Sequence, residues 1–528
     1  MTRSVVRPSG RPTNDDALPL DPALVRELTA DVVATGEPVT TIAPFTGGPL
    51  ATLPQSTASD VTDAFIAARE AQREWAATPV RRRIKPFLRL YDLMLSRQHE
   101  VLDLIQWETG KARLHAFEEL LDAATSTLYY ARHAERLLRP RRRAGALPIL
   151  TRTVETPLPK GVVGTITPWN YPFALAMDVV PALLAGNAVV HKPDTQTALS
   201  SLWPRALLVE LGLPAALWQV VLGNPVDVGA PMIEHADYIG FTGSTAAGRA
   251  IAEQAARRLI GCSLELGGKN PMLVLADADL DKTVQAAVRA CFSSAGQLCV
   301  SMERIYVHES VHSEFVARFA ERTRQLRLGS ELDFTADVGS LTSEKQLRNV
   351  AAAVDAARQG GATVVTGGRP RPDMGPFFYE PTVLTDVTPD IPLCREETFG
   401  PVVSVYPFAD EDEAVRAAND TQYGLNASIF SRDVKRARRL AARVQAGTVN
   451  INEGYASAYA SQGGPMGGMK ESGLGRRHGS AGLLKYTEPQ SVASQHVLGF
   501  DPAFGLSQQR HAALFTLSLK ALKALRIR

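Results

Sequence analysis

Val162-Val163-Gly164-Thr165-Ile166 begins the part of the chain that decides the fold. Three more short apolar runs follow it, with helix-like stretches between them, at residues 188–191, 220–222 and 238–241. Short apolar strands that alternate with helices indicate βαβ units around a parallel sheet. The sequence therefore predicts an α/β fold in this region.

A second series of the same kind runs from 272 to 450. Its apolar runs lie at 362–366, 402–405 and 448–451. Upstream of both series, residues 81–111 and 114–138 have the spacing of helices, and the Pro- and Arg-containing segment 140–150 has the composition of a connector. Two sheet-centred domains are therefore expected.

Composition limits what the chain can do. Its 528 residues exceed one ordinary core, and its formal net charge of +2 gives no reason to expect nucleic acid as a partner. Four cysteines without paired spacing argue against a disulfide framework or a metal site and favour the cytoplasm. No apolar run is long enough to span a membrane. Residues 1–20 lack the apolar segment of a secretory signal and are expected to form a flexible tail.

Three segments carry candidate chemistry. The first, 241–244 (FTGS), ends a strand and starts a helix whose N-terminus would favour a phosphate, although a plain structural turn fits equally well. The second, 264–271 (LELGGKNP), suggests that Glu265 faces a cleft; the alternative is a strand-edge acid paired with Lys269. In the third, 293–300 (SSAGQLCV), small residues suited to a loop precede Cys299, whereas most lone cysteines are inert core residues.

In their order and spacing, these segments resemble the aldehyde dehydrogenase superfamily. Further matching motifs are Pro168-Trp169-Asn170-Tyr171-Pro172, Lys192-Pro193, Glu397-Thr398-Phe399-Gly400-Pro401 and Gly467-Gly468-Met469-Lys470-Glu471-Ser472-Gly473. The resemblance covers roughly residues 44–488. Within the superfamily, the stretches 296–304 and 461–469 look most like the actinobacterial-type succinate-semialdehyde dehydrogenases.

The resemblance implies an aldehyde dehydrogenase-like fold with a Rossmann-like cofactor domain, an α/β catalytic domain and a bridging oligomerisation hairpin. The expected division is 21–139 and 159–266 for the cofactor-binding domain, 267–470 for the catalytic domain, 140–158 and 471–497 for the bridging segment, and 498–528 for a C-terminal extension. Relatives assemble through such a hairpin, here near 150–157 and 485–492, so a homodimer or homotetramer is expected.

The resemblance also implies thioester chemistry on a small-molecule aldehyde. Cys299 matches the nucleophile, and the Asn170 side-chain amide together with the Cys299 backbone N–H matches the oxyanion donors. Glu265 matches the general base that activates water for hydrolysis.

A dinucleotide site is implied as well. Lys192 and Glu397 match residues that hold the two riboses, and Ser244 matches a pyrophosphate contact. The other matching positions are Ile166, Pro168, Trp169, Gly223, Gly229, Leu266, Gly267 and Phe399. Thr195 stands where many NAD-preferring relatives have a glutamate, and a neutral hydroxyl would not repel a 2′-phosphate. NADP is therefore the expected cofactor, with NAD as the open alternative.

The implied substrate is succinate semialdehyde, which would give succinate. Better-known enzymes of that name have an arginine six residues before the nucleophile to pair with the substrate carboxylate, and Ser293 occupies that position here. Arg289 and Arg304 are the candidates to replace it. The alternative is a broad-specificity aliphatic or aromatic aldehyde dehydrogenase.

Two rival functions are less consistent with the residues. CoA-acylating relatives generally lack the water-activating glutamate, so Glu265 argues against that activity. A non-catalytic binding or structural relative would be expected to lose Cys299, Glu265 or Asn170, and all three are present.

The C-terminal extension mixes apolar and basic residues after Ser507. This composition fits a basic amphipathic helix on a membrane surface. It also fits a helix that packs on its own domain or on a partner subunit, which is the favoured interpretation.

Overall fold

The computed structural model describes residue 5 and residues 19–146, 150–496, 500–502 and 504–526. Most of the expected flexible tail, 1–20, lies outside the described residues; within it, Val5 and Leu20 are buried. Among the residues placed in the structure, none of the helices combines the length and apolar character that a bilayer-spanning segment needs.

A six-stranded sheet with the order β19-β9-β8-β5-β6-β7 forms the first domain. Its strands are β5 (Val162–Ile166), β6 (Ala188–Lys192), β7 (Trp218–Val220), β8 (Tyr238–Thr242), β9 (Gly261–Glu265) and β19 (Gly473–Leu474). All pairings are parallel except that of β19 with β9. The predicted parallel sheet is confirmed, and β5 has the predicted bounds, whereas β7 begins and ends two residues earlier than its predicted run.

Helices surround this sheet and a small hairpin flanks it. They are α1 (Pro22–Thr29), α2 (Ala58–Ala77), α3 (Val80–Ser96), α4 (Gln98–Thr109), α5 (Arg113–Leu138), α6 (Pro172–Ala176), α7 (Val179–Leu184), α8 (Ala198–Glu210), α9 (Pro225–His235) and α10 (Thr245–Arg257), with the hairpin β1 (Gly36–Ile42) and β2 (Pro49–Gln55). The single helix predicted over 81–111 is wrong. The chain breaks at Arg97, which has a non-helical backbone and pairs with Glu100 and Glu210.

A seven-stranded sheet with the order β12-β13-β14-β11-β10-β16-β17 forms the second domain. Its strands are β10 (Asn270–Val274), β11 (Met302–His308), β12 (Thr363–Thr366), β13 (Thr382–Thr385), β14 (Val402–Phe408), β16 (Asn426–Phe430) and β17 (Thr448–Ile451). Alternate residues of β10 point into separate cores, Met272 and Val274 into one and Leu273 into the other. Apolar side chains therefore cover both faces, as parallel sheets require.

Each core of the second sheet has its own helices. The larger core includes residues of α11 (Leu280–Phe292), α12 (Glu309–Arg324) and α13 (Glu344–Gln359), and the smaller one includes residues of α14 (Glu411–Asn419) and α15 (Val434–Ala441). Between β17 and β19 the chain returns to the first sheet through α16 (Ala456–Tyr459) and β18 (Met469–Lys470). β18 pairs with β15 (Tyr423–Gly424) of the second domain, and α17 (Gly479–Leu484) follows β19.

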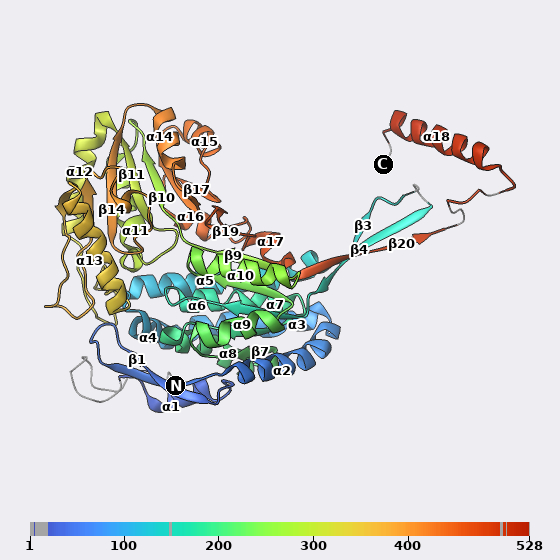
Figure 1. Ribbon diagram of the computed structural model, residues 1–528, viewed down its shortest axis with the longest axis horizontal. Helices are drawn as coiled ribbons and strands as arrows, with labels where there is room; N and C mark the ends of the chain where they lie inside the picture. Colours follow the sequence, from blue (N-terminus) through green and yellow to red (C-terminus); the bar gives the residue numbers. More distant parts are fainter. Residues whose placement is uncertain (1–4, 6–18, 147–149, 497–499, 503, 527–528) are drawn as a thin grey trace.

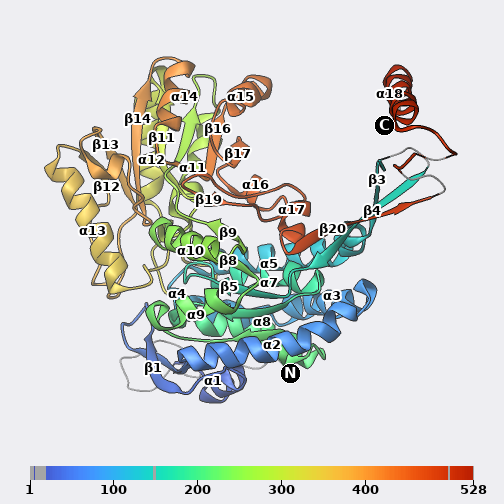
Figure 2. The same ribbon diagram turned by 45° about the vertical axis from the view of Figure 1, so that its right-hand side comes forward.

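A three-stranded ribbon extends away from both domains (Figures 1 and 2). It consists of β3 (Arg141–Arg143), β4 (Thr151–Pro159) and β20 (Thr487–Gln495), all antiparallel, with Thr487 opposite Pro159 and Gln495 opposite Thr151. We call these strands the arm. The predicted bridging hairpin is thus present as strand pairing.

The C-terminal helix α18 (Gln508–Ala524) lies at the far end of the arm, clear of both domains in both views (Figures 1 and 2). None of its residues is buried. Packing of this helix on its own domain, one of the interpretations favoured from the sequence, is therefore wrong.

Candidate active site

The two sheets present opposite ends of their strands to each other. In the first sheet β5, β6, β8 and β9 run parallel, so their carboxyl ends, at Ile166, Lys192, Thr242 and Glu265, lie along one edge. In the second sheet β10, β11 and β14 begin directly after the LGGK, Cys299 and Glu397 segments. Candidate residues from both domains therefore meet between the carboxyl edge of one sheet and the amino edge of the other, and α/β folds commonly bind ligands at such carboxyl edges.

Cys299 lies in a strained loop between α11 and β11. Ser294, Ala295 and Gly296 have φ values of 51°, 54° and 70°, and a Cβ on Gly296 would lie 2.0 Å from the Gly400 carbonyl oxygen. The Asn270 side chain then holds the peptide after the cysteine by donating to the Cys299 carbonyl at 2.8 Å. Strain of this kind gathers at functional sites, where the surrounding structure maintains it.

The Cys299 thiol is partly buried and faces two carboxylates. Burial, and then the negative charges of Glu265 and Glu397, raise its pKa to about 12, although Arg477 opposes the shift. The thiol is therefore protonated at neutral pH and needs a base before it can act as a nucleophile.

Glu265 ends β9 and lies beside the Gly467 backbone. A Cβ at Gly467, where φ is 148°, would lie 2.9 Å from Glu265 Oε1, so this position needs glycine. Burial raises the pKa of Glu265 to about 7, while the cationic side chains of Arg477, Lys485 and Arg476 lower it and Asp178 raises it. A carboxyl group with this pKa can both accept and donate a proton near neutral pH.

Asn170 follows β5 and is buried. Its side-chain amide donates to the Gln297 carbonyl at 3.0 Å, two residues before Cys299. An amide nitrogen carries two hydrogens, so one remains for a ligand at the cysteine. This bond links the first domain directly to the Cys299 loop.

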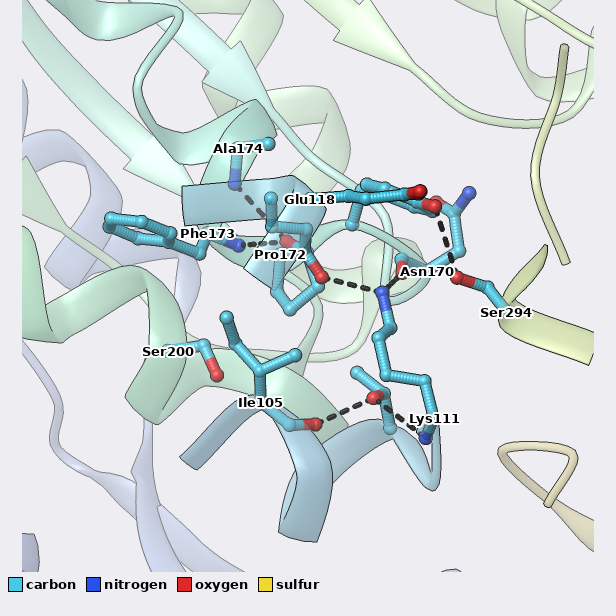
Figure 3. A network of polar contacts seen from close by, with 12 residues as sticks. Ile105, Lys111, Glu118, Asn170, Pro172, Phe173, Ala174, Ser200 and Ser294 are labelled. Atoms are coloured by element: carbon cyan, nitrogen blue, oxygen red, sulfur yellow. Dashed lines mark hydrogen bonds and ion pairs between the residues drawn. The ribbon is translucent and has the colours of Figure 1, made fainter. Parts of the chain in front are cut away.

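A buried ion pair holds the backbone carbonyl of Asn170 (Figure 3). The Lys111 ammonium contacts Glu119 at 2.5 Å and donates to the Asn170 carbonyl at 2.6 Å. Glu119 in turn accepts the backbone N–H groups of Phe173 and Ala174 at the start of α6, at 3.0 and 3.2 Å. The loop that carries Asn170 is therefore held at two points, the Asn170 carbonyl and the start of α6.

Glu397 packs against the two glycines of the LGGK segment. Its Oε1 accepts the Gly268 N–H at 2.8 Å, and a Cβ on Gly267 would lie 2.4 Å from its Oε2. Burial, and then the negative charge of Glu303, raise the pKa of Glu397 to about 8, although the Gly268 N–H and Lys269 oppose the shift. Because a Cβ on Gly268 would also lie 2.8 Å from the Cys299 carbonyl oxygen, the glycines bring Glu397 and the Cys299 loop together.

Lys269 pairs with Glu303 rather than Glu265, so the structural alternative for the LELGGKNP segment is wrong. The ammonium contacts Glu303 at 2.5 Å, and both side chains are buried. Glu303 also accepts the N–H groups of Thr398 and Phe399, at 2.9 and 3.0 Å. The pair fixes the loop that carries Glu397.

The expected cofactor residues are distributed along the edge of the first sheet. Lys192 ends β6 and is buried, which lowers its pKa, although Asp194 opposes this shift. The Asp194 carboxylate accepts the Gln196 N–H at 2.9 Å, and the Thr195 hydroxyl lies 3.5 Å from Gln55 Oε1. Ser244 caps α10 by accepting the Ala247 N–H at 3.3 Å.

The remaining expected positions are on the same edge or next to it. Ile166, Pro168 and Trp169 follow β5, Gly223 follows β7, Gly229 is in α9, and Leu266 and Gly267 follow β9. Phe399 approaches from the second domain, with its ring edge-on to Trp169 at 5.6 Å between centroids. Dinucleotide sites commonly combine a cation, a helix N-terminus and close approach of the backbone. On this edge Lys192 is a cation, Ser244 caps a helix N-terminus, and the glycines leave the backbone without side chains.

The two arginines considered for a substrate carboxylate differ in their surroundings. Arg304 is buried and donates to the carbonyl groups of Lys269, Ala417 and Ala418, so it is committed to the fold. Arg289 is half-exposed and pairs with Glu453. Arg304 as a replacement for the missing arginine is therefore wrong.

Ser293 takes part in a chain of hydroxyl groups. Tyr455 donates its hydroxyl to Glu118 at 2.8 Å and contacts the Ser293 hydroxyl at 3.0 Å. The Arg289 guanidinium lies over the Tyr455 ring, 5.6 Å from its centre. A parallel contact joins the Tyr171 and Ser294 hydroxyls at 3.0 Å. Arg289 is thus a cation beside the position where the sequence lacks one.

A profile of the aldehyde dehydrogenase family matches residues 32–492. The chain belongs to the aldehyde dehydrogenase family. The resemblance inferred from its motifs is confirmed, as is the two-domain α/β architecture.

Named relatives and solved structures agree with this assignment. A Mycolicibacterium smegmatis protein called "Putative succinate-semialdehyde dehydrogenase [NADP(+)]" is 53% identical over 482 residues, which cover 91% of this chain and 93% of that protein. A crystal structure described as an E. coli NADP dependent enzyme has a TM-score of 0.84 and 34% identity, covering 87% of this chain and 95% of the other. Betaine aldehyde dehydrogenase from Staphylococcus aureus, in complex with NAD+, has a TM-score of 0.85 and 30% identity, covering 92% and 98%.

Several residues that organise the site in this aldehyde dehydrogenase were not found from the sequence. They are Lys111, Glu119, Asp178, Asn270, Glu303 and Arg477. Most are charged, and nothing in the local pattern separates a buried charge from an exposed one. Asn270 was within the quoted LELGGKNP segment, and its position just before a buried strand is the one signal that could have identified it.

Proposed function

We propose that this aldehyde dehydrogenase oxidises succinate semialdehyde to succinate with NADP+, through a thioester on Cys299. The observation that carries the proposal is the convergence of a thiol, a carboxyl group titrating near neutral pH and an amide donor. Cys299 faces Glu265, and Asn170 reaches the Cys299 loop through Gln297.

Nucleophilic attack begins with loss of the thiol proton. Glu265, with a pKa near 7, accepts the proton from Cys299, whose own pKa is about 12. The sulfur then bonds to the aldehyde carbon and the carbonyl oxygen gains a negative charge. The free N–H of the Asn170 amide and the backbone N–H of Cys299 stabilise that charge, and each such donor contributes about 3 kcal/mol to transition-state stabilisation.

Loss of a hydride from this adduct, for which NADP+ would supply the acceptor when bound, would leave the thioester. Lys192, Ser244, Gly267 and Glu397 are the residues that would hold NADP+, because they bring a buried cation, a helix N-terminus, a glycine backbone and a carboxylate to one edge. Glu265 releases its first proton to solvent and then takes one from water, whose oxygen attacks the thioester carbon. The C–S bond breaks, the carboxylic acid leaves and Glu265 returns the proton to the Cys299 sulfur.

NADP preference depends on Thr195. Its side chain carries no charge, and the neighbouring Asp194 carboxylate is occupied in capping the short helix that Thr195 begins. Thr195→Glu should lower kcat/KM for NADP+ by about tenfold or more relative to NAD+, since like charges at close range are costly. Steady-state kinetics with both cofactors measure this; an unchanged ratio would place cofactor selection elsewhere.

The substrate assignment uses the names of the relatives and the position of Arg289. Several mycobacterial relatives, 52–53% identical, are named as succinate-semialdehyde dehydrogenases. Arg289 lies next to Tyr455 and Ser293, where a substrate carboxylate could pair with it. Arg289→Met should raise the KM for succinate semialdehyde by about tenfold, because a charged hydrogen bond contributes about 1.5–3 kcal/mol, and should leave the KM for propanal unchanged.

The deciding experiment is a spectrophotometric panel of succinate semialdehyde, propanal and benzaldehyde with NADP+ and with NAD+. A clear preference for succinate semialdehyde supports the assignment. Equal turnover of all three supports a broad-specificity aldehyde dehydrogenase instead. Cys299→Ala is the control, and NADPH formation by that variant would refute the thioester mechanism itself.

The proposed organisation assigns cofactor binding to residues 21–139 and 159–266, chemistry to 267–470, and bridging between subunits to 140–158 and 471–497. We place the enzyme in the cytoplasm, where its four free cysteines would remain reduced.

A further inference from the structure

Helix α18 makes few contacts with the part of the chain that the structure describes. Its contacts are local: His511 stacks near Phe515 at 4.6 Å between centroids, and the His511 ring contacts the Phe500 carbonyl at 2.9 Å. Phe500 and Phe515 lie 6.3 Å apart. The segment before the helix therefore shields one part of its surface and leaves the rest open.

The open surface includes an apolar face. Leu514, Leu517 and Leu525 are 52%, 65% and 67% exposed. Leu514, Leu517 and Ala521 follow a spacing of three and four residues, which places them on one side of the helix, and Leu525 follows its last turn; Leu519, 65% exposed, lies on the opposite side. Half-buried Phe515 and Leu522 adjoin this side, so the apolar face is wider than a single row.

The other side of the helix carries charge of one sign. Lys520 and Lys523 lie there and are exposed, Arg526 follows the last turn of the helix, and Arg510 lies on the leucine side. After Asp501 the chain has no Asp or Glu, and it has five basic residues, Arg510, Lys520, Lys523, Arg526 and Arg528. On α12, by contrast, Arg318 and Arg324 pair with Glu314 and Glu321, whereas α15 resembles α18 in that its charged residues are all basic.

The leucines and the basic residues together distinguish two kinds of partner, a second protein copy and an anionic bilayer. A groove on a second protein copy would cover the leucines, but it gives no reason for every charge on the opposite face to be positive. An anionic bilayer surface satisfies both features, because leucines enter the acyl boundary while lysines and arginines contact the headgroups. The position of α18 at the end of the arm, away from both domains, leaves its apolar face accessible (Figure 2).

We propose that α18 is a peripheral membrane anchor that docks the enzyme on an anionic lipid surface. It lies along the interface rather than across it, since its apolar face is one side of a single helix. Such docking would place the enzyme at a membrane surface, and it does not depend on the substrate assigned above.

The test is co-sedimentation of the full-length enzyme with vesicles of phosphatidylcholine alone or of phosphatidylcholine mixed with phosphatidylglycerol, at low and high salt. Two variants address the two faces, Lys520→Glu/Lys523→Glu and Leu514→Gln/Leu517→Gln. The matched control is Arg438→Glu/Arg439→Glu, which makes the same charge change at exposed positions on α15. Solution activity and molar mass, measured for every variant, verify folding and assembly.

We expect binding to the phosphatidylglycerol vesicles that weakens in high salt. Both α18 variants should lose about tenfold or more of this affinity, since each basic residue near an anionic surface contributes about 1 kcal/mol, and the α15 control should retain it. Absence of binding by the unmodified enzyme, or equal loss in the α15 control, would overturn the proposal. A change in molar mass in the α18 variants without any vesicle binding would show instead that α18 packs on another subunit.

Discussion

Glu265 determines the pH at which this site can work, because burial places its pKa at about 7. A general base acts only when deprotonated, so kcat should rise with pH up to about 7 and then level off, while the Cys299 thiol stays protonated across this range. Glu265→Gln should abolish this rise of kcat with pH, the acid limb of the profile, and should lower kcat by about a hundredfold or more. A pH profile of both enzymes measures this. If the Gln variant keeps the acid limb, another group is the base.

Arg477 and Asp178 adjust the same carboxyl group in opposite directions. Their side chains pair at 2.8 Å, and Arg477 lowers the pKa of Glu265 whereas Asp178 raises it. Arg477→Gln should therefore move the acid limb of the kcat profile to higher pH, and Asp178→Asn should move it to lower pH. Opposite shifts cannot result from general loss of folding, which would lower kcat without a consistent direction. Shifts of the same sign would contradict this account.

At the scale of elements, the Lys111–Glu119 pair joins α5 to the Asn170 loop and the start of α6. Lys111→Met leaves a buried carboxyl group unpaired and should lower the free energy of unfolding by about 3–5 kcal/mol. Kcat should fall as well, since the Asn170 carbonyl loses its anchor. Adding Glu119→Gln should recover part of the stability, because a glutamine carbonyl can still accept the N–H groups of Phe173 and Ala174.

Chemical denaturation of these variants provides the measurement. The control is Arg81→Met, which breaks the ion pair of Arg81 with Glu135 between largely exposed side chains. Such pairs contribute at most about 1 kcal/mol. If Lys111→Met is no more destabilising than the control, the buried pair does not hold the loop.

Elements with strong local patterns were predictable, and those decided by tertiary contacts were not. The apolar runs that became β5 and β17 gave the correct bounds, and the motifs around Cys299 gave the correct family. The break at Arg97 was missed because the helical spacing continues through it, and the local sequence does not show that this side chain reaches a glutamate in α8. The pairing of Lys269 with Glu303 was missed because the partners are distant in sequence, with Lys269 just before β10 and Glu303 on β11.

At the scale of the whole molecule, the contacts among the strands of the arm are too few to make the arm stable by itself. Along β20, every residue after Thr487 is exposed, and Val492 lies opposite Val154 of β4. Ribbons of two or three short strands are marginally stable alone in water. The arm is therefore expected to add its strands or side chains to a second subunit and to be ordered by that contact.

Val492 offers a direct test of assembly through the arm, since it is 52% exposed in the single chain. Val492→Asp would bury a charge in the proposed subunit contact and should reduce the molar mass from a dimer or tetramer toward a smaller species. Val434→Asp is the matched control, because Val434 is 40% exposed on α15, away from the arm. Light scattering after gel filtration, without lipid, separates the outcomes. Removal of 507–528 should leave the mass of the assembly unchanged, because α18 is assigned to lipid and the arm to the partner subunit. If the unmodified enzyme is a monomer, or if Val492→Asp does not alter the mass, the arm does not hold subunits together.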